Sequence, residues 1–249
     1  MLYAVNLNHE GTIGQVLPNG DSSIFIQLPN GSIGNGIRFN SFGNMFIADY
    51  VNHNIYKVEM PTMQLSVFAH EPLMSQPNDI AIDDRDILYA SDPNWKDSSG
   101  RIWRIGTDGK VTLLQSGMGT TNGIEVSPDN KILYVNETVQ RKVWAFDLSG
   151  KRQLSNKRLL IEFRDFGLDG MRSDIEGNLY ITRYGKGTVV KISPKGKLLH
   201  EIKLHGKNPS NIAFGGEDGK TIFVTVQDVG NIETFRVEEP GREWKMQNN

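Results

Sequence analysis

Residues 167–183 read GLDGMRSDIEGNLYITR, in which two short segments alternate apolar and polar residues on either side of the turn signal IEGN. Alternation with a period of two residues, interrupted by Gly and Asn, is typical of two β-strands joined by a tight turn. Asp169 stands directly before Gly170, and an Asp-Gly pair is by itself ordinary turn chemistry. Whether Asp169 is a turn residue or a functional group depends on the rest of the chain.

The same pattern recurs along the chain at a nearly constant interval. One segment of each unit centres on an aromatic residue flanked by aliphatic ones, and successive aromatics lie 43, 43, 45, 46 and 43 positions apart. These aromatics are Tyr3, Phe46, Tyr89, Tyr134, Tyr180 and Phe223. A second strand-like segment follows each of them, and from Phe46 onwards a third precedes them.

Three strands with room for a fourth, in units of about 45 residues, are the signature of a β-propeller blade. Six units therefore predict an all-β, six-bladed propeller that forms a single domain over residues 1–249. A β-sandwich is the alternative all-β fold, but it does not explain three series of strands kept in one register. No segment has the pattern of a long amphipathic helix.

Composition excludes several classes of function. The net charge of −2 and the pI near 6.2 give no basic footprint for nucleic acid or acidic membranes. The absence of cysteine excludes a disulfide framework, a thiolate nucleophile and Cys-ligated metals. No apolar run approaches the roughly 18 residues needed to span a bilayer, and no signal peptide is visible. We expect a small-molecule substrate, no nucleic-acid or membrane partner, and prefer the cytoplasm as compartment.

One column of the repeat places polar residues at the start of the strand expected nearest the propeller axis. This column contains Asn35, Asn78, Asn122, Asp169 and Ser210. Because blades are arranged radially, residues in one column converge on the axis. Amide and carboxylate oxygens without His or Cys suit Ca²⁺ better than zinc or copper. The column therefore predicts a ligand site in the central channel, and a hydrogen-bonded polar plug is the alternative.

A second polar column lies at the ends of the aromatic strands and is expected near the same mouth of the channel. It contains Asp49, Asp92, Glu137 and Arg183. Arg183 supplies the positive charge of this column and is a candidate for orienting an anionic or carbonyl-bearing ligand. Trp95 lies in a loop and is a candidate wall of a pocket, whereas Trp103 and Trp144 are expected in the core between blades.

Four stretches give nearly the whole chain a resemblance to the SMP-30/gluconolactonase/LRE-like family of six-bladed propellers. They are QPNDIAIDDRDILYASDPNW (76–95), TTNGIEVSPDNKILYVNET (120–138), LDGMRSDIEGNLYITR (168–183) and NPSNIAFGGEDGKTIFVT (208–225). The resemblance implies that Asn122 and Asp169 are ligands of a divalent cation, usually calcium. It also implies that Asn78 contacts the metal or the substrate, and that Asp169 acts as general base or nucleophile.

The chain departs from the family pattern in its first blade. The family's remaining ligand is a glutamate in a Glu-Gly-Pro motif on the innermost strand of that blade. The inner column precedes the repeat aromatic by 11 to 13 positions, and the same distance before Tyr3 falls upstream of Met1. We therefore expect a first blade without its innermost strand and a metal site with one carboxylate among neutral amides. The open strand edges predict a monomer or an edge-strand-mediated homo-oligomer.

The sequence favours a calcium-dependent hydrolase of a lactone or related ester. In this hypothesis Asp169 and Asn78 are catalytic, and Asn78, Asn122 and Asp169 hold the ion. The residues predicted to bind the substrate are Asn35, Asp92, Glu137 and Arg183. Two alternatives remain, namely a non-catalytic binding or scaffold propeller with a decayed metal site, and an organophosphate-type hydrolase that uses the same cation.

Overall fold

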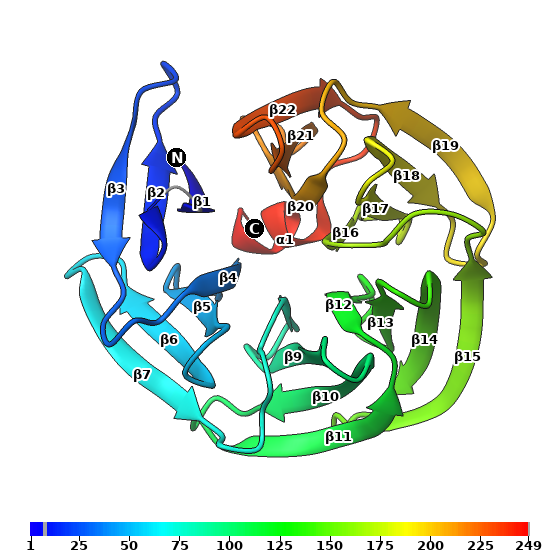
Figure 1. Ribbon diagram of the computed structural model, residues 1–249, viewed down its shortest axis with the longest axis horizontal. Coiled ribbons are helices and arrows are strands. Elements are labelled where there is room, and N and C mark those ends of the chain that lie inside the picture. The colour runs from blue at the N-terminus through cyan, green and yellow to red at the C-terminus, as the bar shows by residue number, and fades with distance from the viewer. Residues whose placement is uncertain (7–8, 249) are drawn as a thin grey trace.

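Six antiparallel sheets surround a central axis in the computed structural model, which describes residues 1–6 and 9–248 (Figure 1). The sheets follow one another in chain order, so that each unit of the sequence repeat forms one blade. The predicted all-β, six-bladed propeller is confirmed.

The blades are numbered here in chain order. Blade 1 contains β1 (Leu2–Asn6), β2 (Thr12–Val16) and β3 (Ser22–Gln27), and blade 2 contains β4 (Gly34–Phe39), β5 (Met45–Asp49), β6 (Asn54–Glu59) and β7 (Gln64–His70). Blade 3 contains β8 (Ile80–Ile82), β9 (Leu88–Asn94), β10 (Ser99–Ile105) and β11 (Val111–Met118), and blade 4 contains β12 (Thr121–Val126), β13 (Ile132–Glu137), β14 (Lys142–Leu148) and β15 (Leu154–Glu162). Blade 5 contains β16 (Met171–Ser173), β17 (Leu179–Arg183), β18 (Thr188–Ile192) and β19 (Leu198–Lys203), and blade 6 contains β20 (Pro209–Gly215), β21 (Thr221–Val226) and β22 (Asn231–Arg236).

Apolar side chains fill the spaces between neighbouring blades. Five buried clusters join blades 1 to 6 in succession, and Phe46 and Trp103 meet in the cluster between blades 2 and 3. Trp144 lies half-buried in the next cluster, with the Lys157 ammonium 4.2 Å from its ring centre. Burial of both faces of an aromatic strand explains its mostly apolar sequence, as in β5, which reads MFIAD and is buried throughout.

Blades 1 and 6 differ from the others. Within the described residues their sheets have three strands each, and β1 carries Tyr3, the first aromatic of the repeat. Tyr3 packs on Phe25 and Phe39, with ring centres 4.7 and 5.7 Å apart. No buried apolar cluster among the described residues joins blade 6 to blade 1, and an open cavity reaches between them instead.

The innermost strands carry bulges close to the positions of the polar column. The pairing register shifts between Gly34 and Ile37 in β4, and between Thr121 and Ile124 in β12. A bulge re-aims side chains and breaks strict alternation. Residues three positions apart, such as Asn122 and Glu125, therefore line the same cavity.

The glycines that follow the polar column are required by close packing between inner strands. A Cβ on Gly36 would lie 2.8 Å from the Cα of Asp79, and one on Gly123 would overlap the backbone oxygen of Asp169. Neither glycine has a positive φ, so neither serves as a turn residue. The pairs 35–36 and 122–123 are thus strand residues, and the pair 169–170 directly precedes β16; all three let adjacent blades approach.

Replacing Gly123 with Ala should lower the free energy of unfolding by about 1–3 kcal/mol, because the added methyl group has no space. Urea denaturation would measure the change. Gly150→Ala is the matched control, since a Cβ there meets no atom within 4 Å and should change stability by less than about 0.5 kcal/mol. Equal stability of the two variants would contradict the packing argument.

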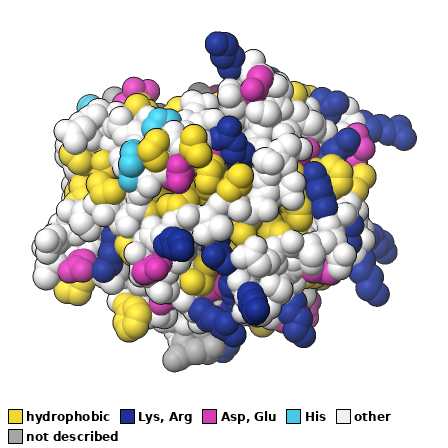
Figure 2. Space-filling model, turned by 90° about the horizontal axis from the view of Figure 1, so that it is seen from below, with side chains coloured by type: hydrophobic (Ala, Val, Ile, Leu, Met, Phe, Trp, Pro, Cys, Tyr) yellow, Lys and Arg dark blue, Asp and Glu magenta, His cyan; other side chains and the backbone are white. Residues whose placement is uncertain are grey.

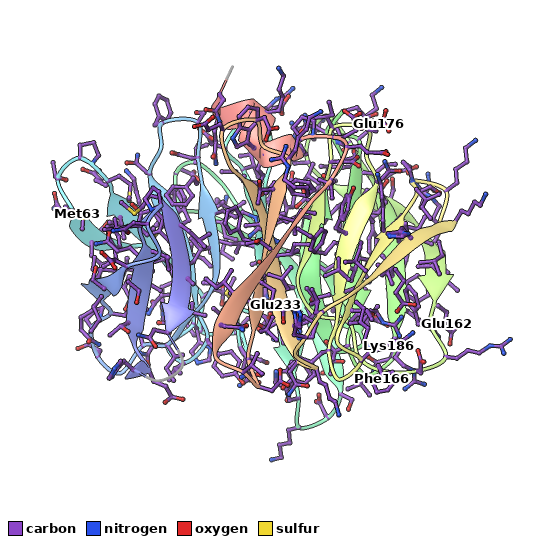
Figure 3. All side chains as sticks on the ribbon, turned by 90° about the horizontal axis from the view of Figure 1, so that it is seen from above. Met63, Glu162, Phe166, Glu176, Lys186 and Glu233 are labelled. Carbon is purple, nitrogen blue, oxygen red and sulfur yellow. The ribbon has the colours of Figure 1, made fainter. Side chains whose placement is uncertain are left out.

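One short helix, α1 (Arg242–Gln247), crosses one end of the channel on the axis of the propeller (Figure 1). Figure 3 shows α1 at the same end as Glu176, while Phe166 and Lys186 lie at the opposite end. Among the described residues no helix is long and apolar enough to span a bilayer. On the side wall shown in Figure 2, basic side chains lie among acidic and apolar ones.

Candidate metal and catalytic site

The polar column opens onto one large cavity. Its volume is about 1520 Å³, and it extends from the channel into the space between blades 6 and 1. All five residues of the predicted column line this cavity, namely Asn35, Asn78, Asn122, Asp169 and Ser210. Asp169 follows the loop of Phe166, which places this end of the inner strands away from α1 (Figure 3). The structure thus brings the column together as the sequence predicts.

Asn122 and Asp169 face one another across blades 4 and 5. Asn122 Nδ2 donates a hydrogen bond to Thr138 Oγ1 at 3.1 Å, and Thr138 Oγ1 in turn donates to the Leu168 carbonyl at 2.7 Å. Asn136 Nδ2 donates to the backbone oxygen of Asp169 at 2.6 Å. Asn136 of β13 and Thr138 just after that strand therefore hold the Asp169 backbone and the Asn122 side chain in place.

One acceptor of this pair has no partner. Asn122 is 4% exposed, and its Oδ1 atom accepts no hydrogen bond from the described residues. A buried amide oxygen without a donor costs about 1–3 kcal/mol. Such an oxygen beside a carboxylate is the kind of donor that a hard cation would satisfy.

The Asp169 carboxyl group lies in an environment that disfavours its charge. Desolvation raises its pKa well above the usual range, and the nearby Asp79 carboxylate raises it further, while a hydrogen bond from Asn122 acts in the opposite direction. No basic side chain forms an ion pair with Asp169 in the part of the chain that the structure describes. A cation at this position would supply the missing positive charge.

Asn78 is held by its backbone between blades 2 and 3. Its N–H donates to the Ser91 carbonyl at 2.9 Å, and its own carbonyl accepts from Gly36 N at 2.7 Å. Its side chain is buried at the cavity wall. The donor set of Asn78, Asn122 and Asp169 contains one carboxylate and two amides. No group of three or more His, Cys, Asp or Glu side chains with metal-binding geometry occurs among the described residues.

The strand-end column is placed differently from our expectation. Asp92 and Glu137 are buried and do not line the cavity. Asp92 accepts hydrogen bonds from the backbone N–H groups of Ser75 and Gln76, both at 2.7 Å, and from Trp103 Nε1 at 2.9 Å. Glu137 Oε1 accepts from Gly119 N at 2.7 Å. These carboxylates satisfy buried backbone donors, so the geometry gives them a structural role.

Arg183 does not line the cavity either. Its Nη2 atom donates to Asp165 Oδ1 at 2.7 Å, and its guanidinium carbon lies 4.0 Å from the ring centre of Phe163. Asp49, the fourth member of the column, accepts from Ser32 Oγ at 2.8 Å. Of the predicted substrate-binding residues, Asn35 alone lines the cavity, and Asp92, Glu137 and Arg183 do not.

Several aromatic side chains line the cavity, among them Trp95 and Tyr184. Trp95, in the loop that follows β9, is 37% exposed and lines it, as the sequence predicted for a pocket wall. Tyr184 lines it from the loop after β17 and donates its hydroxyl hydrogen to Gln227 Oε1 at 2.8 Å. Broad apolar faces beside polar groups are typical of small-molecule sites.

Sequence reasoning missed a group of charged residues deeper in the channel. Arg38, Glu125 and Arg172 each stand three positions after a member of the polar column, and all three line the cavity. Burial, and next the Glu243 carboxylate, raise the pKa of Glu125 to about 8. Burial raises the pKa of Asp79 to about 6 despite the nearby Arg38. The repeat contained the signal, because these residues recur at one fixed offset.

Comparison with known proteins supports the fold and the family. The family model described as SMP-30/Gluconolactonase/LRE-like region matches residues 2–228. A gluconolactonase from Zymomonas mobilis is 28% identical over 244 residues, which cover 84% of this chain and 68% of the relative. Pentonolactonase XacC from Haloferax volcanii is 29% identical over 151 residues, covering 59% of this chain and 52% of the relative.

A solved structure has the same fold. The calcium-binding protein regucalcin from Agrobacterium tumefaciens superimposes with a TM-score of 0.83 at 21% identity, covering 96% of this chain and 86% of that one. With a match from residue 2 to residue 228, the chain belongs to the SMP-30/gluconolactonase/LRE-like family.

Proposed function

We propose that this protein hydrolyses a small lactone or related ester in the cavity at the end of the channel opposite α1. Asn78, Asn122 and Asp169 are the proposed holders of a divalent cation, with calcium as the first candidate. The observation that carries the proposal is the unpartnered Oδ1 atom of Asn122 beside a desolvated carboxylate without a basic partner. Relatives named as lactonases and a calcium-binding regucalcin with the same fold support it.

The donor set fits a hard cation of modest affinity. Calcium takes six to eight oxygen ligands, which include amide and backbone carbonyls and waters as well as carboxylates. When bound, a divalent cation supplies Lewis-acid polarisation of a carbonyl group. Because calcium affinity rises with the number of charged ligands, one carboxylate predicts a weak site with a Kd of about 10⁻⁴–10⁻³ M.

The chain's own residues supply the remaining chemistry. Asp169 lines the cavity, and its carboxylate is the proposed general base that accepts a proton from an attacking water. Asn35 and Asn78 line the same cavity and are proposed to orient the polar groups of the substrate. Trp95 and Tyr184 would cover the apolar face of the substrate.

Calorimetry and a substrate panel test the proposal together. We expect the protein, stripped with chelator, to release or take up heat on titration with calcium, and Asn122→Ala to weaken that binding at least about tenfold. Calcium-loaded protein should hydrolyse members of a panel of five- and six-membered lactones. The release of protons measures the rate of this hydrolysis.

Two results would end the proposal. One is a protein that binds none of calcium, magnesium, manganese and zinc and turns over no lactone. The other is hydrolysis of phosphotriesters with no hydrolysis of any lactone, which would assign the site to organophosphate chemistry.

A further inference from the structure

Four charged side chains form a closed cluster between the candidate site and α1. They are Arg38 of β4, Asp79 just before β8, Arg172 of β16 and Glu243 of α1, and we call them the floor cluster. Three blades and the C-terminal helix thus meet near the axis. Arg38, Arg172 and Glu243 line the cavity.

Opposite charges alternate around the floor cluster. The two oxygens of Asp79 lie 3.3 Å from Arg38 Nη1 and 3.1 Å from Arg172 Nη1. On the other side, Glu243 places its oxygens 2.7 Å from Arg38 Nε and 3.9 Å from Arg172 Nε. Two guanidinium groups and two carboxylates make the cluster neutral as a whole.

The floor cluster is buried, so a net charge on it would be only weakly screened by solvent. Both arginines and Asp79 are almost completely buried, and Glu243 is 21% exposed. Buried charges are screened far less than exposed ones, so an uncompensated charge acts over a longer distance. The neighbouring Glu125 has its closest partners outside the cluster, with its Oε1 atom 3.7 Å from Arg242 Nη1 and 3.2 Å from Ser173 Oγ, although the Glu243 carboxylate raises its pKa.

The floor cluster is connected directly to a candidate ligand. Asp79 follows Asn78 in the chain, and its Oδ1 atom accepts a hydrogen bond from Ile80 N at 2.9 Å. Its own N–H donates to Ser91 Oγ at 3.0 Å. The backbone of residues 78–80 is therefore held in one conformation, and the Asp79 carboxylate lies close enough to the Asp169 carboxyl group to raise the pKa of that group.

We propose that Glu243 is a positioning residue whose carboxylate keeps the floor cluster neutral and thereby sets the affinity of the site for a divalent cation. This inference rests on the proposed function. Without the Glu243 charge, two buried guanidinium groups face a single carboxylate, and the excess positive charge repels a cation. Without the Arg172 charge, the cluster has an excess negative charge, which attracts one.

Calorimetric titration with calcium tests these opposite effects. Glu243→Gln should weaken calcium binding about tenfold, and Arg172→Gln should tighten it by a similar factor. The double variant restores neutrality, so its affinity should return to within about threefold of the wild type. Glu238→Gln is the control, because Glu238 is an exposed carboxylate that precedes the same helix.

The opposite signs separate charge compensation from a merely structural role. Loss of packing alone would make both single variants bind more weakly and the double variant weaker still, and this result would overturn the inference. Unchanged affinity in Glu243→Gln would also overturn it, while leaving the proposed function intact if the wild type binds calcium. A wild-type protein that binds no divalent cation would overturn both. If one variant fails to fold, the sign measured for the other decides.

Discussion

Replacing Asp169 with Asn should lower kcat for the hydrolysed lactone by about 10²–10⁴-fold, because the cavity loses its proposed general base. The amide has nearly the same shape as the carboxylate, so the strand and the cavity should remain intact. The Asn136 hydrogen bond that fixes this segment goes to the backbone oxygen of Asp169, which the substitution leaves in place. Initial rates at saturating calcium measure the effect.

Calcium affinity should fall in the same variant, since the site loses its one carboxylate among the three proposed ligands. Asp108→Asn is the matched control, because Asp108 is an exposed turn residue whose carboxylate accepts a bond from Lys110 N at 3.0 Å. The control should retain wild-type rates. Turnover by Asp169→Asn within threefold of the wild type would remove Asp169 from the reaction.

The fold could be predicted because the propeller repeats one local pattern six times. Each unit combines the same alternation, the same aromatic position and the same turn signals, so errors in any one unit are corrected by the others. The polar column followed from the same register, since equivalent residues of radially arranged blades must converge. Asn78, Asn122 and Asp169 do line one cavity.

The strand-end column shows where a register alone is insufficient. The register correctly places Asp92 near the end of β9, but the loop between β7 and β8 turns the backbone N–H groups of Ser75 and Gln76 toward it. A buried carboxylate forms hydrogen bonds with backbone N–H groups that have no other partner. Loop conformation varies from blade to blade, and the repeat therefore carries no information about which way these side chains turn.

The Asn-Gly and Asp-Gly pairs illustrate a second limit. Sequence statistics associate them with turns, whereas Gly36 and Gly123 lie in strands at contacts between blades. Glycine is required at these positions because a Cβ atom would clash with the adjacent blade, whose strand lies about 45 positions away in the chain. Glu243 was missed for a related reason, because it comes from a helix outside the repeat.

Asp79→Asn should lower the free energy of unfolding by about 3–5 kcal/mol, because it removes one partner of a buried ion pair. Arg38 and Arg172 would then share Glu243 as their remaining partner within the floor cluster. Urea denaturation measures the loss. Asp84→Asn is the control, since Asp84 also pairs with an arginine but is 54% exposed, and such pairs contribute about 0–1 kcal/mol.

Comparison with blade 6 indicates that the stability lost in Asp79→Asn would come from the missing charge and not from a missing hydrogen bond to the neighbouring backbone. Asn211 occupies the equivalent position there, and its Oδ1 atom accepts a hydrogen bond from Ile212 N at 2.8 Å, as Asp79 does from Ile80 N at 2.9 Å. An asparagine therefore fits this backbone and keeps its local hydrogen bond. A loss below about 1 kcal/mol, equal to that of the control, would mean that the two arginines do not depend on Asp79 for compensation. A loss in the expected range would make Asp79 the residue through which blades 2, 3 and 5 are held together beneath the site.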